Sequence, residues 1–180
     1  MDAFAVQLVY VRYVAVGLFF YASVLHAGDE VTIGVQLFTN GHMHEARQFF
    51  ASVVQTQPQN PSGFFYAGRI AFEEQQYEPA IENFTKAIEL EEQNSEYHLW
   101  LGRACGRQAE RSSVFRQFLL ARKVKLHLER AVELNPENLP ARADLMEYYT
   151  RAPGFLGGSE EKAREQAQEI AKRARPQAQP

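Results

Sequence analysis

The stretch FFYAGRIAFEEQQYEPAIENFTKAIEL, residues 64–90, decides the fold. Apolar residues recur at helical spacing on both sides of a polar interruption, EEQQYEP. The first half predicts a helix over about residues 61–74, for which Pro61 suits the first turn. The second half predicts a helix over about residues 78–91, where Pro79 lies in the first turn and its missing N–H costs nothing. The stretch is therefore two antiparallel helices, and neither of them can bury its apolar face alone.

This helix pair is repeated along the chain. Three glycines stand 34 residues apart: Gly34, Gly68 and Gly102. Three further pairs share that interval: Ala46 with Ala80, Phe50 with Phe84, and Val53 with Ala87. Several columns with one period indicate a repeated unit. The small residues recur because the two helices of a unit must approach closely, and a larger side chain at Gly68 or Ala80 would push their axes apart.

The repeating unit resembles the tetratricopeptide repeat (TPR), whose columns are a large residue, Leu-Gly, an aromatic residue, Ala, Phe or Tyr, Ala and Pro. Units one and two, residues 27–60 and 61–94, follow these columns closely. Unit three begins at Ser95 and unit four at about Leu139, and both carry insertions. The resemblance covers about residues 27–174. It implies an all-α fold, with four helix pairs in a right-handed superhelical stack.

The two insertions are the individual features of this chain. The first, RACGRQAERSSVFRQFLLARKVKLHL (residues 103–128), contains Ser112 as the expected N-cap of a long helix that reaches Leu134. The second, APGFLGGS, predicts a loop whose Ser159 caps the next helix, with Glu160 in the first turn where the helix dipole favours acids. The whole segment EYYTRAPGFLGGSEEKAREQA is similar to a motif of exported bacterial TPR proteins.

The first 27 residues differ from the rest of the chain. YVAVGLFFYASVL, residues 13–25, is an uncharged run that follows Arg12 and precedes HAGDE, which is the layout of a secretory signal cleaved after Ala27. Two alternatives stay open, an uncleaved N-terminal anchor and a helix packed on the domain. Thirteen helical residues span about 20 Å, less than the roughly 30 Å of a bilayer's hydrocarbon core. The expected location is therefore the periplasm or the exterior, with membrane anchoring as the alternative.

Composition sets further limits. The chain has 180 residues and a formal net charge of −3, so no global basic field attracts nucleic acid. Its single cysteine, Cys105, excludes an intrachain disulfide. Residues 28–174 are expected to form one helical domain, and RPQAQP, residues 175–180, a disordered tail.

No catalytic constellation is evident in the sequence. His42 and His44 lie two residues apart on a predicted turn, and no further metal ligands converge on them. Cys105 falls on the apolar face of a helix, which is typical of a structural thiol. The glycines of GFLGG follow a helix rather than a strand, and no Lys-Ser/Thr follows them, so they form no phosphate loop. We therefore expect no enzyme, no metal and no cofactor.

The resemblance places the functional surface on the concave side, which the first helix of each TPR unit lines. It puts three phenylalanines at an apolar end and three arginines at a basic end: Phe38, Phe65 and Phe72, and Arg69, Arg103 and Arg107. Aromatic residues and arginines supply many binding hot spots. The alternative is that the phenylalanines pack between helices and the arginines are solvated. A chaperone-tail clamp is not expected, because Val31 and Val35 stand where it needs Lys and Asn.

The resemblance thus implies a non-enzymatic module that binds a protein or peptide partner in its concave groove and acts outside the cytoplasm. The alternative is a structural scaffold that self-associates as a homodimer through the end of the stack or through the long helix. Nucleic acid is not expected as a partner. Membrane contact is expected only through the N-terminal segment, if that segment is uncleaved.

Overall fold

The computed structural model describes residues 31–174, so the expectations for residues 1–27 and 175–180 lie outside the described residues. Within this range every regular element is helical, which confirms the all-α prediction. After a helical segment at residues 31–39 come α2 (Met43–Thr56), α3 (Pro61–Glu73), α4 (Tyr77–Leu90), α5 (Ser95–Ala109), α6 (Val114–Leu134), α7 (Leu139–Arg151), the 3-10 helix η1 (Gly154–Leu156) and α8 (Glu160–Ala174). The described residues divide between two compact units, and the boundary lies between Phe49 and Phe50, inside α2.

The described part of the first unit consists of the helical segment at residues 31–39, a turn and the beginning of α2. Gly41 adopts a φ of +79° between residues 31–39 and α2, a left-handed conformation that glycine takes without steric cost. His42 precedes α2 and His44 lies in its first turn, and both side chains are exposed. The two histidines are therefore turn and surface residues, as predicted.

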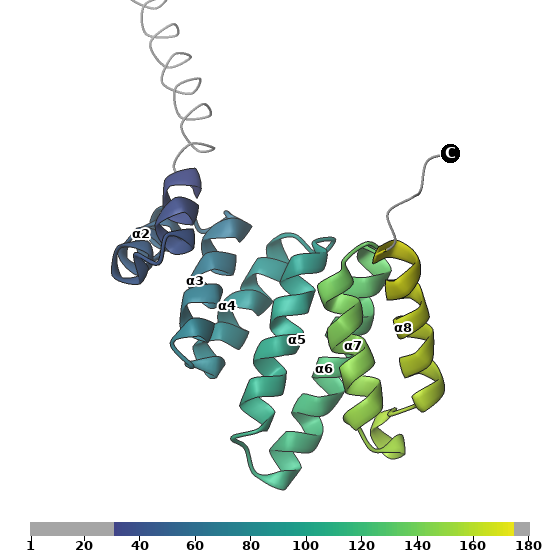
Figure 1. The fold of residues 1–180 in the computed structure, drawn as a ribbon. Helices are drawn as coiled ribbons and strands as arrows, with labels where there is room; N and C mark the ends of the chain where they lie inside the picture. The colour runs from purple at the N-terminus through teal and green to yellow at the C-terminus, as the bar shows by residue number, and fades with distance from the viewer. Residues whose placement is uncertain (1–30, 175–180) are drawn as a thin grey trace, which may run out of the picture. The chain divides into compact units, whose positions relative to one another are not determined.

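In the second unit, consecutive helices pack on one another as a stack (Figure 1). α3 pairs with α4, α5 with α6, and α7 with α8, while α4 packs on α5 and α6 packs on α7. Phe65 joins two hairpins, because its ring centroid lies 5.9 Å from that of Phe84 and 4.8 Å from that of Tyr97. The predicted helices at 61–74 and 78–91 agree with α3 and α4 to within one residue.

An asparagine caps the first helix of each hairpin in this unit. The side chains of Asn60, Asn94 and Asn138 accept hydrogen bonds from backbone N–H groups in the first turns of α3, α5 and α7. Asn138 is also buried, and its Nδ2 donates to Ser95 Oγ over 2.9 Å. A capping side chain satisfies one of the free N–H groups at a helix start. Asn60 and Asn94 keep the period of 34, whereas Asn138 falls later because of the insertion in the α5–α6 hairpin.

Two of the periodic glycines lie where the helices of a hairpin are closest. A Cβ atom at Gly68 would stand 2.8 Å from the Phe84 ring, and one at Gly102 would stand 3.0 Å from Leu128 Cδ2. Real Cβ atoms essentially never come as close as the distance at Gly68, and at Gly102 the Leu128 side chain would have to move by a few tenths of an ångström. The requirement for a small residue at these positions is therefore confirmed.

The insertions take the predicted form, with one correction. α6 has 21 residues against 14 in α4, but its N-cap residue is Ser113 rather than the predicted Ser112. The Ser112 hydroxyl instead donates to the Gln108 carbonyl over 2.8 Å, in the last turn of α5. Ser159 does cap α8, since its Oγ accepts a hydrogen bond from the Lys162 N–H over 3.3 Å.

We expect Gly68→Ala and Gly102→Ala each to lower the free energy of unfolding by about 1–3 kcal/mol, because the added methyl group overpacks the hairpin. Gly106→Ala on the same helix as Gly102 is the matched control. A Cβ there would meet only Val124 Cγ2, at 3.8 Å. That variant should gain up to about 1 kcal/mol from helix propensity. Urea denaturation followed by circular dichroism measures all three, and equal effects at the three positions would contradict the packing argument.

Candidate functional site

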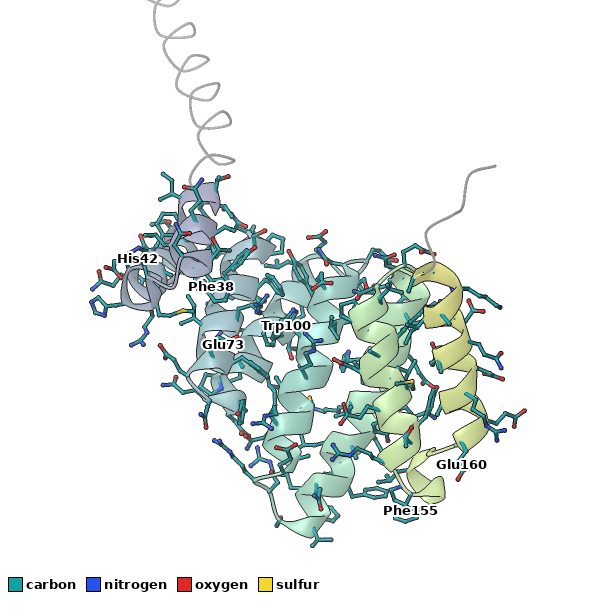
Figure 2. The ribbon with its side chains drawn as sticks, viewed as in Figure 1. Phe38, His42, Glu73, Trp100, Phe155 and Glu160 are labelled. Atoms are coloured by element: carbon teal, nitrogen blue, oxygen red, sulfur yellow. The ribbon has the colours of Figure 1, made fainter. Side chains whose placement is uncertain are left out.

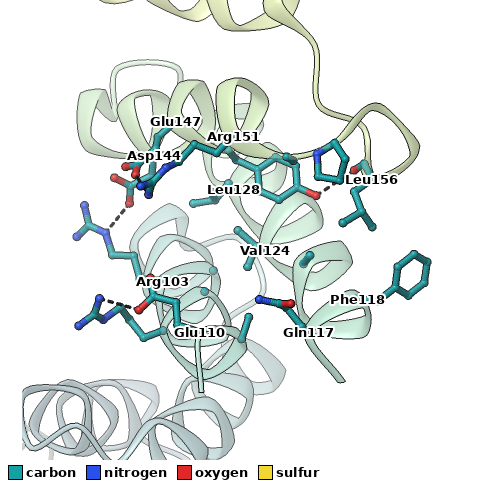
Figure 3. A pocket seen from close by; sticks show the side chains of 18 of the residues that line it. Arg103, Glu110, Gln117, Phe118, Val124, Leu128, Asp144, Glu147, Arg151 and Leu156 are labelled. Carbon is teal, nitrogen blue, oxygen red and sulfur yellow. Dashed lines mark hydrogen bonds and ion pairs between the residues drawn. The ribbon is translucent and has the colours of Figure 1, made fainter. Parts of the chain in front are cut away.

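A cavity of about 840 Å³ lies between α5, α6 and α7, with η1 and the residues before it as one wall (Figure 3). We call it the α5–α7 pocket. Its apolar floor comes from one side of α6, at Ala121, Val124 and Leu128. Its rim is charged and comes from α5 and α7. The rim residues are Arg103, Arg107, Glu110, Asp144, Glu147 and Arg151.

The pocket is open because of a second glycine on α5. Gly102 and Gly106 lie one helical turn apart and both line the pocket. Gly102 brings α6 into contact through Leu128, whereas a Cβ atom at Gly106 would have room before Val124. The first glycine therefore sets the distance between α5 and α6, and the second leaves space above the floor.

Ion pairs fix the rim. Arg103 Nε lies 2.6 Å from Asp144 Oδ2 and joins α5 to α7 across the pocket (Figure 3). The other two ion pairs each join residues about one turn apart, Arg107 with Glu110 at 2.9 Å and Arg151 with Glu147 at 2.6 Å. These two pairs are largely exposed, so each contributes little to stability and is free to exchange its partner.

The η1 wall is a fixed loop rather than a loose one. Tyr148 on α7 donates its hydroxyl hydrogen to the Leu156 carbonyl over 2.9 Å. Gly157 adopts a φ of +92°, and a Cβ atom at Gly158 would lie 1.7 Å from the Ala152 carbonyl oxygen. Only glycine fits at these two positions. The sequence APGFLGG predicted a loop here, and the structure adds that the loop lines a cavity.

Trp100 ties α3 to α5 beside the pocket (Figure 2). The guanidinium carbon of Arg69 lies 3.6 Å from its ring centroid, and that of Arg103 lies 4.7 Å away. Phe72 meets the same ring edge-on at 5.3 Å. Burial lowers the pKa of Arg69, and the nearby carboxylate of Glu73 acts against that shift. Two cations on one indole are a favourable arrangement, because the ring faces carry negative charge.

The structure separates the six residues predicted for the groove. Phe72, Arg103 and Arg107 line the α5–α7 pocket, and Arg69 stacks on Trp100 beside it. Phe65 is only 7% exposed and packs among Phe84 and Tyr97, so its ring belongs to the core and not to a binding surface. Phe38, in the first unit, is also buried. For Phe65, the contacts agree with the alternative of packing between helices.

Sequence reasoning missed the residues that α6, α7 and η1 contribute. Val124 and Leu128 lie on α6, a second helix, Leu156 lies in an insertion, and Tyr148 lies on the first helix of unit four, for which no concave position was predicted. The only feature of the sequence that could have indicated this pocket is the presence of insertions in two neighbouring units. The spacing of apolar residues does not predict the direction in which the inserted turns extend.

Comparison with known proteins supports the repeat architecture. Residues 67–142, fewer than half of the 180, match the family model of the regulator of microtubule dynamics proteins 1–3. No curated protein matches the sequence significantly.

Solved structures resemble most of the chain. TTC0263, a TPR protein of Thermus thermophilus, is 19% identical and superposes with a TM-score of 0.66 over 81% of this chain and 73% of its own. The fold is that of a TPR protein. YrrB, described as a TPR protein with an unusual peptide-binding site, is 16% identical with a TM-score of 0.62, over 81% of this chain and 67% of its own. The first TPR of Spaghetti (RPAP3), bound to an HSP90 peptide, is 19% identical with a TM-score of 0.57, over 66% of this chain and 86% of its own.

Within residues 31–174 of this TPR fold, no cluster of three or more His, Cys, Asp or Glu side chains is placed to hold a metal ion. None of the helices in that range combines the length and the apolar composition of a membrane span. Cys105 is fully buried, and burial raises the pKa of its thiol to about 11, so the reactive thiolate is strongly disfavoured.

A pair of histidines lies between α5 and α6 of the TPR stack. Nδ1 of His98 lies 3.0 Å from Nδ1 of His127, and Nε2 of His98 lies 3.0 Å from the Glu92 carbonyl oxygen. Because a carbonyl only accepts, His98 donates from Nε2 and accepts at Nδ1 from His127. Burial, the neighbouring His98 and Lys123 lower the pKa of His127 from 6.5 to about 4, and burial also lowers that of His98.

This pair predicts that stability falls as the solution is acidified. The unfolded chain binds a proton near pH 6.5 and the folded chain only near pH 4, so the free energy of unfolding should drop through that window. We expect His127→Gln to remove about 2 kcal/mol of the drop, since the ring is partly solvated. Urea midpoints of wild type and variant at pH 7.5, 6, 5 and 4 measure the difference, in which the shared titration of carboxylates cancels. Parallel curves would contradict the assignment.

Proposed function

We propose that this chain is a non-enzymatic module that binds a segment of a partner protein in the α5–α7 pocket. The observation that carries the proposal is the pocket itself, with its apolar floor, its fixed charged rim and its volume of about 840 Å³. Ligand pockets commonly have volumes of about 300–1,000 Å³ and combine an apolar lining with a few placed polar groups. The pocket follows the helix pairs of a repeat stack, which is where such folds present extended binding surfaces.

The lining indicates what the partner segment must offer. Val124 and Leu128 favour apolar side chains inserted toward α6. Arg107 and Arg151 lie on the rim in exposed ion pairs, so each can leave its own carboxylate for one on the partner. Arg103 is held by Asp144 and stacked on Trp100, so it acts as a fixed donor. The partner segment therefore carries at least one large apolar residue and an acidic residue close to it.

The structural relatives support a protein or peptide as the partner. YrrB is described with a peptide-binding site, and the RPAP3 repeat was solved with a peptide bound. The chaperone peptide itself is not proposed as the partner here, because Val31 and Val35 occupy the positions at which a clamp needs polar side chains. Nucleic acid is not proposed either, given the net charge of −3.

Blocking the pocket should abolish binding without unfolding the protein. We expect peptides selected from a random library on the wild-type chain to bind Gly106→Leu at least tenfold more weakly, because the new side chain fills the space above Val124. Gly106→Ala is the control and should bind as wild type does. Calorimetry gives the affinities, and Trp100, the sole tryptophan, reports binding near α5 by fluorescence. If selected peptides bind both variants equally, the site lies elsewhere.

We also propose that the module acts outside the cytoplasm, in the periplasm or the exterior. The support is the arrangement of Arg12, the uncharged run at residues 13–25 and Ala27. N-terminal sequencing of the protein from its native source should give Gly28 as the first residue. A mature chain that retains residues 1–27 would favour the anchored alternative if it fractionates with membranes, and would contradict export if it is recovered in the cytosol.

A further inference from the structure

Exposed apolar side chains are concentrated on one part of the molecule. Among the described residues, all large exposed apolar side chains except Ile33 belong to α6 or η1: Val114, Phe115, Phe118, Leu119, Leu126 and Phe155. Phe155 (Figure 2) is 79% exposed, although the hydrogen bond from Tyr148 to the Leu156 carbonyl holds its loop. Apolar side chains gathered in one place mark an interaction surface, whereas scattered ones do not.

Several of these residues lie along the outward side of α6, beside a hollow that Phe118, Leu126 and Phe155 help to line. Phe115, Leu119, Arg122 and Leu126 follow one another at intervals of four, three and four residues, the seam along which two helices pack. Phe155 stands across from this seam, and its ring stacks on Phe118 with centroids 6.4 Å apart. A hollow of about 640 Å³ lies between the seam and η1, and we call it the α6–η1 groove.

The groove is basic in a chain that is acidic as a whole. Between Arg111 and Leu128 the sequence contains five basic residues and no acidic one. Arg122, Lys123 and Lys125 line the hollow. Its one carboxylate, that of Glu129, already accepts a hydrogen bond from Tyr149 over 2.7 Å and lies 3.7 Å from Lys125. A positive potential therefore remains for an acidic partner.

We propose that the α6–η1 groove docks an acidic amphipathic helix of a partner protein. The partner's apolar stripe packs along Phe115, Leu119 and Leu126, and its flanking carboxylates face the basic side chains. From Phe115 to Leu126 the seam extends for about 17 Å at 1.5 Å per residue, so about three turns of partner helix cover it. This groove adjoins the α5–α7 pocket and shares Phe118, Phe155 and Leu156 with it, but Arg122 and Leu126 line the groove alone.

The charge pattern favours this occupant over two others. A second copy that packed its own α6 on this seam would place basic residues opposite basic residues, which is unfavourable. If the seam were inserted into a lipid bilayer, Arg122 would enter the bilayer too, because it lies between Leu119 and Leu126. Placing a charged side chain there is costly. A helix with a carboxylate at the facing position instead pairs with that arginine.

The test uses the full chain and a fluorescent 21-residue peptide with leucines at heptad positions a and d and glutamates at e and g, at a concentration where the peptide is monomeric. We expect the chain to bind this peptide at least tenfold more tightly than a scrambled peptide of the same composition. Arg122→Glu and Leu126→Ser should each lose at least tenfold in affinity. Arg164→Glu, an exposed charge reversal on α8, is the matched control and should bind as wild type does. Gly106→Leu should also bind normally, so failure of this proposal and failure of the pocket proposal are distinguishable.

Three results would overturn the proposal. The first is no binding, or equal binding of the ordered and scrambled peptides. The second is binding that Arg122→Glu and Leu126→Ser leave unchanged. The third is use of the groove by another occupant. A second copy would be shown by a wild-type dimer that Leu126→Ser dissociates in sedimentation. A membrane would be shown by phosphatidylglycerol vesicles that bind wild type but neither variant, while the peptide does not bind.

Discussion

The structure depends on how closely the two helices of each hairpin approach. At Gly68 and at Gly102 the facing side chains, Phe84 and Leu128, occupy the space that a Cβ atom would need. Because the helices approach closely at these two glycines, Phe84 and Leu128 extend across their own hairpins and contact the next one. Phe84 reaches beyond α3 and α4 to within 6.4 Å of the Trp100 ring on α5, and Leu128 packs in one cluster with Leu145 on α7. The stack is thus a series of local contacts, each of which positions the next hairpin.

The candidate site arises where the repeat departs from its own period. The insertion in the third unit lengthens α6, and the insertion in the fourth unit forms the η1 loop. Residues from both segments line the pocket. The long helix serves both candidate surfaces, with Val124 and Leu128 on the side that faces the pocket and Leu119 and Leu126 on the outward side. Tyr148 and two glycines hold the loop, so Phe155 is presented at a fixed place despite its exposure.

Of the residues predicted for the groove, Phe72, Arg103 and Arg107 line the pocket whereas Phe65 is buried in the core, and this difference has a physical cause. The guanidinium groups of Arg103 and Arg107 are paired with Asp144 and Glu110 at the rim of the pocket, because burying an unpaired charge would be costly. A phenylalanine on the same face has no such constraint. Phe65 is drawn between Phe84 and Tyr97, since the neighbouring hairpin offers an apolar surface that the sequence of its own helix does not reveal.

Residues close in the sequence determined the repeat, the helix bounds to within about a residue, the N-cap of α8 and the loop before it. These features depend on local periodicity, steric limits at glycine and backbone hydrogen bonding, which act within a few turns of chain. Only the tertiary structure decided which surfaces stay open. The Arg103–Asp144 pair joins residues 41 positions apart, and the Phe118–Phe155 stack joins two insertions. Such contacts depend on how far an inserted segment extends and in which direction it turns. The spacing of apolar residues cannot predict this, because it indicates only which side of its own helix a residue occupies.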